Sequence, residues 1–519
     1  MKKFSIADLA RIIKATVETV TENEHQVSSI EHRVSSHDFF TGVSIDTRTI
    51  KPGECFFAIP GENFDGHDYV CDAFARGAAC AVVSRDIYSK FQIRNSKSEI
   101  LKEEGKCLLK VADTITALGD FAREYRRQAG FKVVAITGSV GKTTTRHIAY
   151  HVLSRHFCVF QSPKNFNNNI GLPLTLLGAD PEHQIVIAEL GTNHPGEIVY
   201  LTGIALPDVA VVTNVHPAHL EGFGSTQAIA REKLSIAEGL QPDGVLIING
   251  DLLPLLSASG SQTPNKIVTF GKKKAWSVER GANRKKLDAK RYPLNADFQA
   301  GNIRFDERGS RFIIGGTEIR LPLPGPGNVE NALAAWAICA QFGPTIDDFA
   351  QAVSAEGGLA PVSMRTELLQ IGTLTVINDC YNANPASMKN ALQILSSLGS
   401  TRKGRLVFIC GDMAELGEQT EQLHAELGES IARTRVQLLL AVGKFAKIAA
   451  EAAKPPKTSW RTDAIRHELQ IECFEDTASA CNNLQKFVKD SDIILVKGSR
   501  TAGLEAAVEK LKELFGKRK

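Results

Sequence analysis

The residues best suited to chemistry lie in the segment Gly138-Ser139-Val140-Gly141-Lys142-Thr143-Thr144, which follows an apolar run and opens a helical pattern. Glycines let backbone N–H groups turn toward phosphate oxygens, the lysine adds positive charge, and the first threonine hydroxyl can hold magnesium. The spacing is G-x-x-G-K-T, with Ile136 where the complete phosphate-loop pattern has its first glycine. The segment predicts an ATP-binding loop, and a plain Gly-Ser turn is the alternative.

A second candidate residue is Glu189, which ends the apolar run Ile185-Val186-Ile187-Ala188. Ligands of open α/β sheets gather at the carboxyl ends of parallel strands, and a carboxylate there suits magnesium. The next apolar run, Val209 to Asn214, is followed by a polar stretch that contains His219. An ordinary strand-end acid is the alternative for Glu189, and an acid–base group or a satisfied structural residue is the alternative for His219.

These residues need a scaffold of parallel strands, and strand patterns alternate with helical patterns along the whole chain. The fold class expected is α/β with three domains, over residues 1–125, 126–343 and 344–519. The central domain is expected to hold a P-loop-type, mostly parallel sheet, and the C-terminal domain to be Rossmann-like. The strands expected are Gly42–Ile45, Cys55–Ile59, Ala79–Val83, Ile185–Leu190, Val209–Asn214, Val245–Asn249, Leu374–Asn378, Arg405–Cys410, Leu438–Val442 and Ile493–Val496.

Composition narrows the class of protein. The 519 residues carry 61 basic and 58 acidic side chains, so no global field draws the chain to nucleic acid or to a membrane surface. The basic segment 272–290 lacks a series of stacking aromatics and is interpreted as a solvated insertion. The ten cysteines form no C-x-x-C pair, and neither a signal-peptide pattern nor an uncharged membrane span occurs. A cytoplasmic protein with reduced thiols is expected.

Motifs in all three domains resemble the Mur ligase family, the ATP-dependent amide-forming enzymes of peptidoglycan precursor synthesis. Ser44-Ile45-Asp46-Thr47-Arg48 is similar to the family's UDP-sugar recognition domain, which implies Ser44, Thr47 and Arg48 as substrate contacts. A surface turn with an Asp46–Arg48 ion pair is the alternative. The polar stretch from Lys164 to Thr175 resembles the segment facing the growing peptide and implies Asn167 and Asn168, although Asx turns could explain part of it.

The resemblance also implies roles in ATP and metal binding. Asn331 is expected near adenine, Arg365 at the ATP phosphates across a domain cleft, and Glu189 and His219 at magnesium. Lys233 is similar to the family lysine that takes up carbon dioxide as a carbamate and binds a second magnesium, and a solvated helix lysine is the alternative. Lys142, Lys233, Arg365 and His219 are thus the catalytic candidates. The chain departs from the family pattern at four positions: Leu234, Ser235, Gly327 and Met364.

The stretch Val376 to Met388 is most similar to family members that add a dipeptide. It implies Asp379, Asn382 and Asn384 as dipeptide contacts, with Lys497 and Arg500 as partners of a carboxylate, and capping of a loop is the alternative for these two. The resemblance thus implies a monomer that joins D-alanyl-D-alanine to UDP-N-acetylmuramoyl-tripeptide through an acyl phosphate, using ATP and magnesium. Another amide-forming step of the same family, a P-loop small-molecule kinase and a non-enzymatic binding module are the alternatives.

Overall fold

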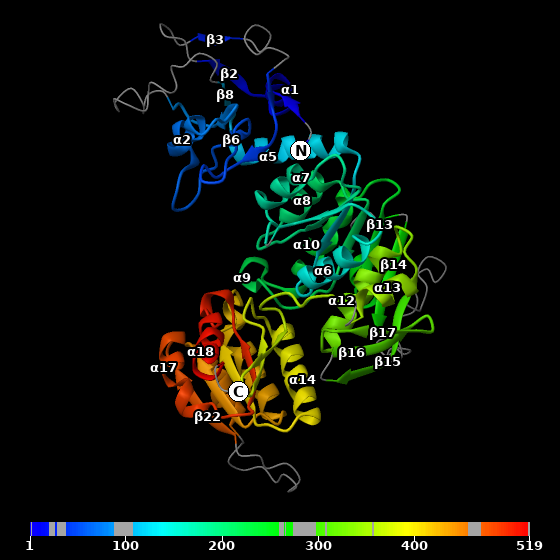
Figure 1. Cartoon of the computed structure of the whole chain (residues 1–519), viewed down its shortest axis with the longest axis vertical. Coiled ribbons are helices and arrows are strands. Elements are labelled where there is room, and N and C mark those ends of the chain that lie inside the picture. Colours follow the sequence, from blue (N-terminus) through cyan, green and yellow to red (C-terminus); the bar gives the residue numbers. More distant parts are fainter. Residues whose placement is uncertain are drawn as a thin grey trace.

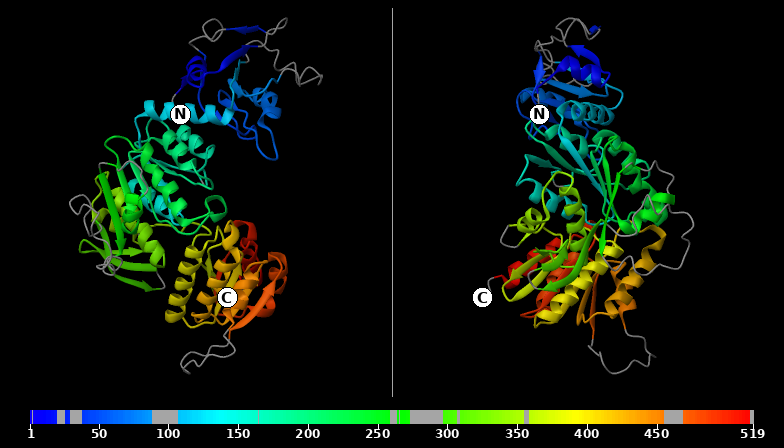
Figure 2. Two further views of the ribbon diagram at one scale, coloured as in Figure 1. Left: turned by 180° about the vertical axis from the view of Figure 1, so that it is seen from behind. Right: turned by 90° about the vertical axis from the view of Figure 1, so that its right-hand side faces the viewer.

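The computed structural model describes residues 1, 3–19, 26–28, 38–87, 107–163, 165–258, 264, 266–272, 297–306, 309–354, 358–454 and 469–516. Three α/β lobes follow one another in an arc, with the N-terminal lobe at one end and the C-terminal lobe at the other (Figures 1 and 2). The α/β class with largely parallel sheets, expected from the alternating patterns, is confirmed. Residues 273–290 of the expected insertion lie outside the described residues.

The N-terminal lobe is a six-stranded sheet in the order β3-β2-β8-β7-β6-β5, beside a short β1-β4 pair. Strands β5 to β8 are parallel, whereas β2 runs antiparallel to β3 and β8. The strands are β1 (Phe4–Ser5), β2 (Thr16–Thr19), β3 (Gln26–Ser28), β4 (Phe39–Phe40), β5 (Val43–Ser44), β6 (Cys55–Phe57), β7 (Cys80–Val83) and β8 (Cys107–Lys110), and the helices are α1 (Ile6–Ile12), α2 (Val70–Ala75) and α5 (Thr114–Ala129).

Helix α5 links the N-terminal lobe to the central lobe. It begins at Asp113, whose side chain accepts from the Thr116 backbone N–H, and it ends at Gly130, whose φ of 76° is left-handed. Its apolar face shares one core with both lobes, because Phe121 and Tyr125 pack with Phe4 on one side and Leu176 on the other. The helix therefore crosses the predicted 125/126 boundary and packs against α7 (Gly171–Gly178) and α8 (Glu197–Ala205) of the central lobe.

The central lobe holds a nine-stranded sheet in the order β10-β11-β9-β12-β13-β14-β15-β16-β17, parallel from β10 to β15. Strands β9, β11 and β12 consist almost entirely of buried apolar residues because helices cover both faces of the sheet. The strands are β9 (Lys132–Thr137), β10 (Val159–Gln161), β11 (Ile185–Glu189), β12 (Val209–Val212), β13 (Val245–Asn249), β14 (Lys266–Lys272), β15 (Phe298–Asp306), β16 (Gly309–Ile314) and β17 (Thr317–Leu321).

The helices of the central lobe are α6 (Lys142–Leu153), α7 (Gly171–Gly178), α8 (Glu197–Ala205), α9 (Leu220–Phe223), α10 (Thr226–Leu234), α11 (Leu253–Ala258), α12 (Pro326–Cys339) and α13 (Ile346–Val353). Helix α13 lies beyond the predicted boundary at 343/344, yet Phe349 and Val353 pack in the core formed by α6 and α12. The chain enters the C-terminal sheet only at Glu367.

The C-terminal lobe is a six-stranded sheet in the order β18-β19-β23-β20-β21-β22, in which only β18 is antiparallel. Its strands are β18 (Glu367–Ile371), β19 (Leu374–Asn378), β20 (Leu406–Gly411), β21 (Leu438–Val442), β22 (Gln470–Phe474) and β23 (Ile493–Lys497), and its helices are α14 (Pro385–Thr401), α15 (Thr420–Ala432), α16 (Ala446–Ala453), α17 (Thr477–Phe487) and α18 (Glu505–Phe515). Two separate cores cover the two faces of this sheet.

The carboxyl ends of strands from both sheets lie at the junction of the central and C-terminal lobes. In the central sheet, β9 lies between β11 and β12, so three loops leave the carboxyl ends of adjacent parallel strands. Ligands collect at such a point in open α/β sheets. Helix α9 reaches across the junction, where Leu220 and Phe223 join an apolar core of the C-terminal lobe.

Candidate active site

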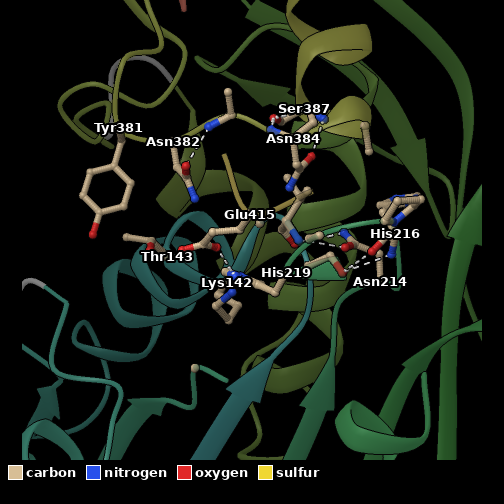
Figure 3. Close-up of a pocket in the computed structure, with 18 of the residues that line it drawn as sticks. Lys142, Thr143, Asn214, His216, His219, Tyr381, Asn382, Asn384, Ser387 and Glu415 are labelled. Atoms are coloured by element: carbon tan, nitrogen blue, oxygen red, sulfur yellow. Dashed lines mark hydrogen bonds and ion pairs between the residues drawn. The ribbon is translucent and has the colours of Figure 1, made fainter. Parts of the chain in front are cut away.

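A cleft of about 1150 Å³ lies between the central and C-terminal lobes (Figure 3). Most of the site residues expected from the sequence line it: Ser139, Val140, Gly141, Lys142, Thr143, Thr144, Asn167, Asn168, Glu189, His219, Asn331, Arg365, Asp379, Asn382, Asn384, Lys497 and Arg500. Gly138 begins the phosphate loop, and Lys233 is buried in α10. Ser44, Thr47 and Arg48 belong to the N-terminal lobe.

The phosphate loop connects β9 to α6 and is braced by the end of β12. Gly138 has a φ of 146°, and a Cβ there would lie 1.9 Å from Thr213 Oγ1, so only glycine is accommodated. The Val140 N–H donates to Asn214 Oδ1 at 2.9 Å, while the Thr213 hydroxyl and the Asn214 amide both donate to the Val140 carbonyl. The loop is therefore preorganised, as an anion cradle must be.

Lys142 lies at the first position of α6, and its Nζ donates to the Gly138 carbonyl at 2.6 Å. Burial lowers the pKa of this amine to about 8, Glu189 opposes the shift, and the positive charge of Arg365 adds to it. Arg365 belongs to the C-terminal lobe, so charges from both lobes act on the same site. An anionic ligand between them would offset their repulsion.

Thr143 and Glu189 form an oxygen pair beneath the phosphate loop. The Thr143 hydroxyl donates to Glu189 Oε2 at 3.1 Å, and Arg146 Nε donates to Glu189 Oε1 at 2.7 Å. Glu189 is only 2% exposed, and Arg146 holds its carboxylate in one orientation. Among the described residues no group of three His, Cys, Asp or Glu side chains could hold a metal. The Thr143 hydroxyl and the Glu189 carboxylate together offer hard oxygens, the kind of ligand that magnesium prefers.

Lys233 is buried in α10, with 2% of its surface exposed. Within the described part of the chain, its amine makes no hydrogen bond or ion pair. Burial lowers its pKa to about 7, with nearby Lys142 adding to the shift. With that pKa about half of the amine is neutral at pH 7, so Lys233 differs from a solvated helix lysine in both its charge state and its surroundings.

The residue before it, Glu232, fixes the position of α10. Its carboxylate accepts from the backbone N–H groups of Gly196 and Ile198 at 2.8 and 2.7 Å, and from the Thr192 hydroxyl at 3.3 Å. These contacts satisfy donors at the start of α8 with a charged acceptor from another helix. Glu232 thereby locks the turn that carries Lys233 against α8.

His219 meets Glu415 across the junction of the lobes. His219 Nδ1 is paired with the Glu415 carboxylate, and the Glu221 N–H donates to the Glu415 carbonyl at 3.3 Å. The hydrogen bond from His219 lowers the pKa of Glu415. Since Nδ1 is engaged by Glu415, Nε2 is the ring nitrogen through which His219 could bind a metal. The role of His219 in metal binding stays a prediction.

The wall formed by the C-terminal lobe is built around Asp379 and Lys497. The Lys497 amine is 2.7 Å from Asp379 Oδ2 and donates to the Asn382 carbonyl at 2.8 Å. The Asn384 side chain accepts from the Ser387 N–H at 2.9 Å and caps α14. The Arg500 guanidinium is 3.1 Å from Glu505 and is 60% exposed. The contacts of Asp379 and Lys497 thus stabilise this side of the cleft, whereas the exposed Arg500 side chain can reach a ligand.

Asn331 and Gly327 place α12 against two different neighbours. A Cβ at Gly141 would lie 2.1 Å from Asn331 Oδ1, so the α12 amide lies directly on the phosphate loop. The Gly327 N–H donates to Asn390 Oδ1 of α14 at 3.0 Å. Gly327, a departure from the family pattern, therefore leaves room for a side chain of the C-terminal lobe.

Similarity to known proteins agrees with this geometry. The Mur ligase family catalytic domain matches residues 39–126, the Mur ligase middle domain matches 136–339, and the Mur ligase glutamate ligase domain matches 364–500. The UDP-N-acetylmuramoyl-tripeptide--D-alanyl-D-alanine ligase of Bacillus subtilis is 33% identical over 99% of both chains. The chain belongs to the Mur ligase family.

The enzyme of the same name from Escherichia coli is also 33% identical to this Mur ligase, over 91% of this chain and 93% of the relative. A crystal structure of MurF from Acinetobacter baumannii has a TM-score of 0.79 at 29% identity and covers 99% of each chain. MurF from Thermotoga maritima in complex with ADP shares the fold at 24% identity, with a TM-score of 0.71 over 92% of this chain and 98% of that one.

Three substrate-contact candidates of this ligase, Ser44, Thr47 and Arg48, lie in the N-terminal lobe and are not among the described residues that line the cleft. In the N-terminal lobe the Ser44 hydroxyl donates to the Asp46 carbonyl, and Arg48 Nη2 lies 2.7 Å from Asp46 Oδ2. The Arg48 side chain is 85% exposed, so the ion pair leaves most of it open to solvent. Asn168 caps α7 by accepting from the N–H groups of Ile170 and Gly171.

Sequence reasoning missed several residues that build the site of this Mur ligase. Arg146 and Asn214 orient Glu189 and the phosphate loop, and Glu415 and Tyr381 pair with His219 and Arg365. Arg146 lies one helical turn after Lys142, which is a readable signal of a shared helix face. Asn214 and Glu415 are far in sequence from their partners, and no local pattern links Tyr381 to Arg365. Among the described residues no helix is long and apolar enough to cross a membrane.

Proposed function

We propose that this Mur ligase joins D-alanyl-D-alanine to UDP-N-acetylmuramoyl-tripeptide, with ATP converted to ADP and phosphate. The observation that carries the proposal is the cleft itself, where the phosphate loop of the central lobe faces Asp379 and Arg500 of the C-terminal lobe. Full-length similarity to ligases of that name supports the choice of substrates. Because one chain supplies both walls, we propose a monomer, acting in the cytoplasm where ATP is available.

In the first step the terminal carboxylate of the tripeptide attacks the γ-phosphorus of ATP, and ADP leaves. Both reactants are anionic, so the barrier is largely electrostatic. Loop N–H groups and Lys142 face the phosphates from the central lobe, and Arg365 offers its guanidinium from the C-terminal lobe. The product is an acyl phosphate with an electrophilic carbonyl carbon.

Thr143 and Glu189 are the residues that would hold magnesium, because their oxygens are adjacent at the foot of the loop. When bound, magnesium would neutralise phosphate charge and orient the transferred group. The Arg146 contact keeps the Glu189 carboxylate turned toward Thr143.

A carbamate on Lys233 is part of the proposal. The neutral amine attacks carbon dioxide, a C–N bond forms, and one proton is released to solvent. The resulting anion would replace a buried amine that has no ion-pair partner in the described chain and that lies close to Lys142. This carbamate offers the oxygens of a second magnesium site without another acidic residue.

In the second step the neutral amine of the dipeptide attacks the acyl carbon, and phosphate departs as the amide forms. Positioning dominates this step. Arg500 is proposed to hold the dipeptide carboxylate, while Lys497 holds Asp379 and the Asn382 backbone in place. Asn167 and Asn168 are proposed along the peptide, and Ser44, Thr47 and Arg48 at the uridine diphosphate in the N-terminal lobe. Asn331 is proposed beside the nucleotide, against the loop that it contacts.

The deciding experiment measures phosphate release with ATP, magnesium and UDP-N-acetylmuramoyl-tripeptide, with and without D-alanyl-D-alanine. Mass spectrometry follows the uridine product. We expect turnover that depends on the dipeptide and yields the pentapeptide product. Turnover with a single amino acid or a shorter acceptor would assign a different Mur step, and a phosphorylated product without an amide would support a kinase.

The carbamate is tested separately with labelled bicarbonate. The carbamate carbon is expected as a new ¹³C resonance in the parent enzyme and not in Lys233→Ala. Short carboxylic acids are expected to restore part of the lost activity of that variant. Full activity of Lys233→Ala without any added acid would exclude the role.

A further inference from the structure

The Arg365 guanidinium lies over the ring of Tyr381, with its central carbon 3.9 Å from the ring centroid. Both side chains line the cleft and both belong to the C-terminal lobe. Figure 3 shows Tyr381 on the same stretch as Asn382, with Lys142 and Thr143 from the central lobe. This stack lies outside the roles assigned above, because Tyr381 is neither a phosphate ligand nor a dipeptide contact.

Arg365 has no other side-chain partner among the described residues. Its guanidinium makes no ion pair or hydrogen bond there, and the carboxylates of Asp379 and Glu367 are engaged by other groups. Asp379 is paired with Lys497, and Glu367 accepts from Asn378 and from the Met364 N–H. An aromatic face holds a cation without using its N–H donors. The five donors of Arg365 therefore remain available for a ligand.

The backbone around Arg365 is held in an unusual conformation. Met364 and Thr366, on either side of it, have φ angles of 58° and 54°, in the left-handed region that non-glycine residues rarely adopt. The Tyr381 N–H donates to the Met364 carbonyl at 3.2 Å, and the Thr366 N–H donates to Asp379 Oδ1 at 3.0 Å. The segment Asp379 to Tyr381 thus holds both the backbone of Arg365 and its side chain.

We infer that Tyr381 is a positioning residue that holds the Arg365 guanidinium over the cleft, with its donors free, before ATP binds. The arginine then approaches the transferred phosphoryl group already oriented within the C-terminal lobe. Its charge already acts on Lys142 across the cleft, which indicates that the two groups share one site. The inference rests on the proposed function of Arg365 at the ATP phosphates. It adds that the ring, and not the phenol hydroxyl, does the positioning.

The test compares Tyr381→Phe, which keeps the ring, with Tyr381→Leu, which removes it. We expect the Phe variant to keep kcat within about twofold of the parent and the Leu variant to lose roughly 3- to 30-fold, since stacking of this kind contributes up to about 2 kcal/mol. The KM for the dipeptide should stay unchanged in both. In an Arg365→Ala background, Tyr381→Leu should cause little further loss.

Equal losses in the Phe and Leu variants would overturn the inference in favour of a hydroxyl contact to substrate. Additive losses in the double variant would also overturn it, because the two side chains would then act independently. Tyr381→Met provides a second ring-free variant if Tyr381→Leu fails to fold, as judged by its circular dichroism.

A readout without substrates separates this inference from the proposed function. The Nε–H proton of Arg365 should resonate upfield in the free protein because of the ring current, and Arg365→Lys assigns it. The upfield position should persist in Tyr381→Phe and vanish in Tyr381→Leu. An unshifted resonance in the parent would refute the stack even in an active ligase, whereas the shift in a protein without ligase activity would refute only the proposed function.

Discussion

Replacing Lys233 by Met should make the central lobe more stable at pH 7 while abolishing ligase activity. The lysine amine is 2% exposed, and its pKa of about 7 in the folded protein compares with 10.5 for the ordinary side chain. Burial of this group costs the native state a few kcal/mol at neutral pH. Methionine has a similar length and no charge to desolvate, so that cost disappears.

The pH dependence isolates ionisation from packing. Between pH 7 and pH 10.5 the unfolded lysine binds more protons than the folded one, so the unfolding free energy of the parent rises with pH. Integrated from pH 7 to pH 9, the rise is about 2 kcal/mol. The methionine variant has no titrating group at this position, so its unfolding free energy lacks this rise. The difference in unfolding free energy between the variant and the parent should therefore shrink by about 2 kcal/mol from pH 7 to pH 9.

Scanning calorimetry in buffer free of carbon dioxide measures the effect. The relevant transition is the one shifted by a non-hydrolysable ATP analogue, which binds the central lobe. For a lobe of this size, about 2 kcal/mol corresponds to roughly 4–8 °C in the midpoint. Lys266→Met, at an exposed position of β14 in the same lobe, is the matched control and should parallel the parent. Parallel pH curves for Lys233→Met and the parent would refute the reasoning, because Lys233 would then titrate like a solvated lysine.

Three further outcomes are expected. Glu232→Ala leaves buried donors of α8 unpaired and should lower stability by about 2–4 kcal/mol, seen as a lower calorimetric midpoint; an unchanged midpoint would mean that water satisfies those donors. Gly138→Ala places a methyl group 1.9 Å from Thr213 Oγ1 and should weaken ATP-analogue binding about a hundredfold by calorimetric titration, with partial recovery in Gly138→Ala/Thr213→Ala. Glu415→Gln breaks the ion pair to His219, which joins the two lobes, and should enlarge the radius of gyration in X-ray scattering. His219→Gln should enlarge it equally. A further increase in the double variant would argue against direct coupling of the two side chains.

Local sequence patterns predicted the scaffold well where burial is uniform. The expected strands at Leu374–Asn378 and Val245–Asn249 coincide with β19 and β13, because strands covered on both faces are continuous apolar runs. The phosphate loop was equally readable, since its glycines and lysine are adjacent in the chain. The limits of the lobes were harder to place, as α5 and α13 pack across them. Turn residues in the sequence indicate where a helix or strand ends, but not which hydrophobic core that helix or strand joins.

The sequence by itself determined the α/β class and the family, and it pointed to cleft residues such as Lys142, Glu189 and Arg365. These features depend on short-range periodicity and on motifs whose residues are consecutive. Only the tertiary structure decided which side chains meet: Glu415 with His219, Lys497 with Asp379, Tyr381 with Arg365, and Lys233 with the field of Lys142. Burial and partner geometry set the protonation state and orientation of such groups. Both depend on residues brought together from distant parts of the chain, so they cannot be obtained from spacing along it.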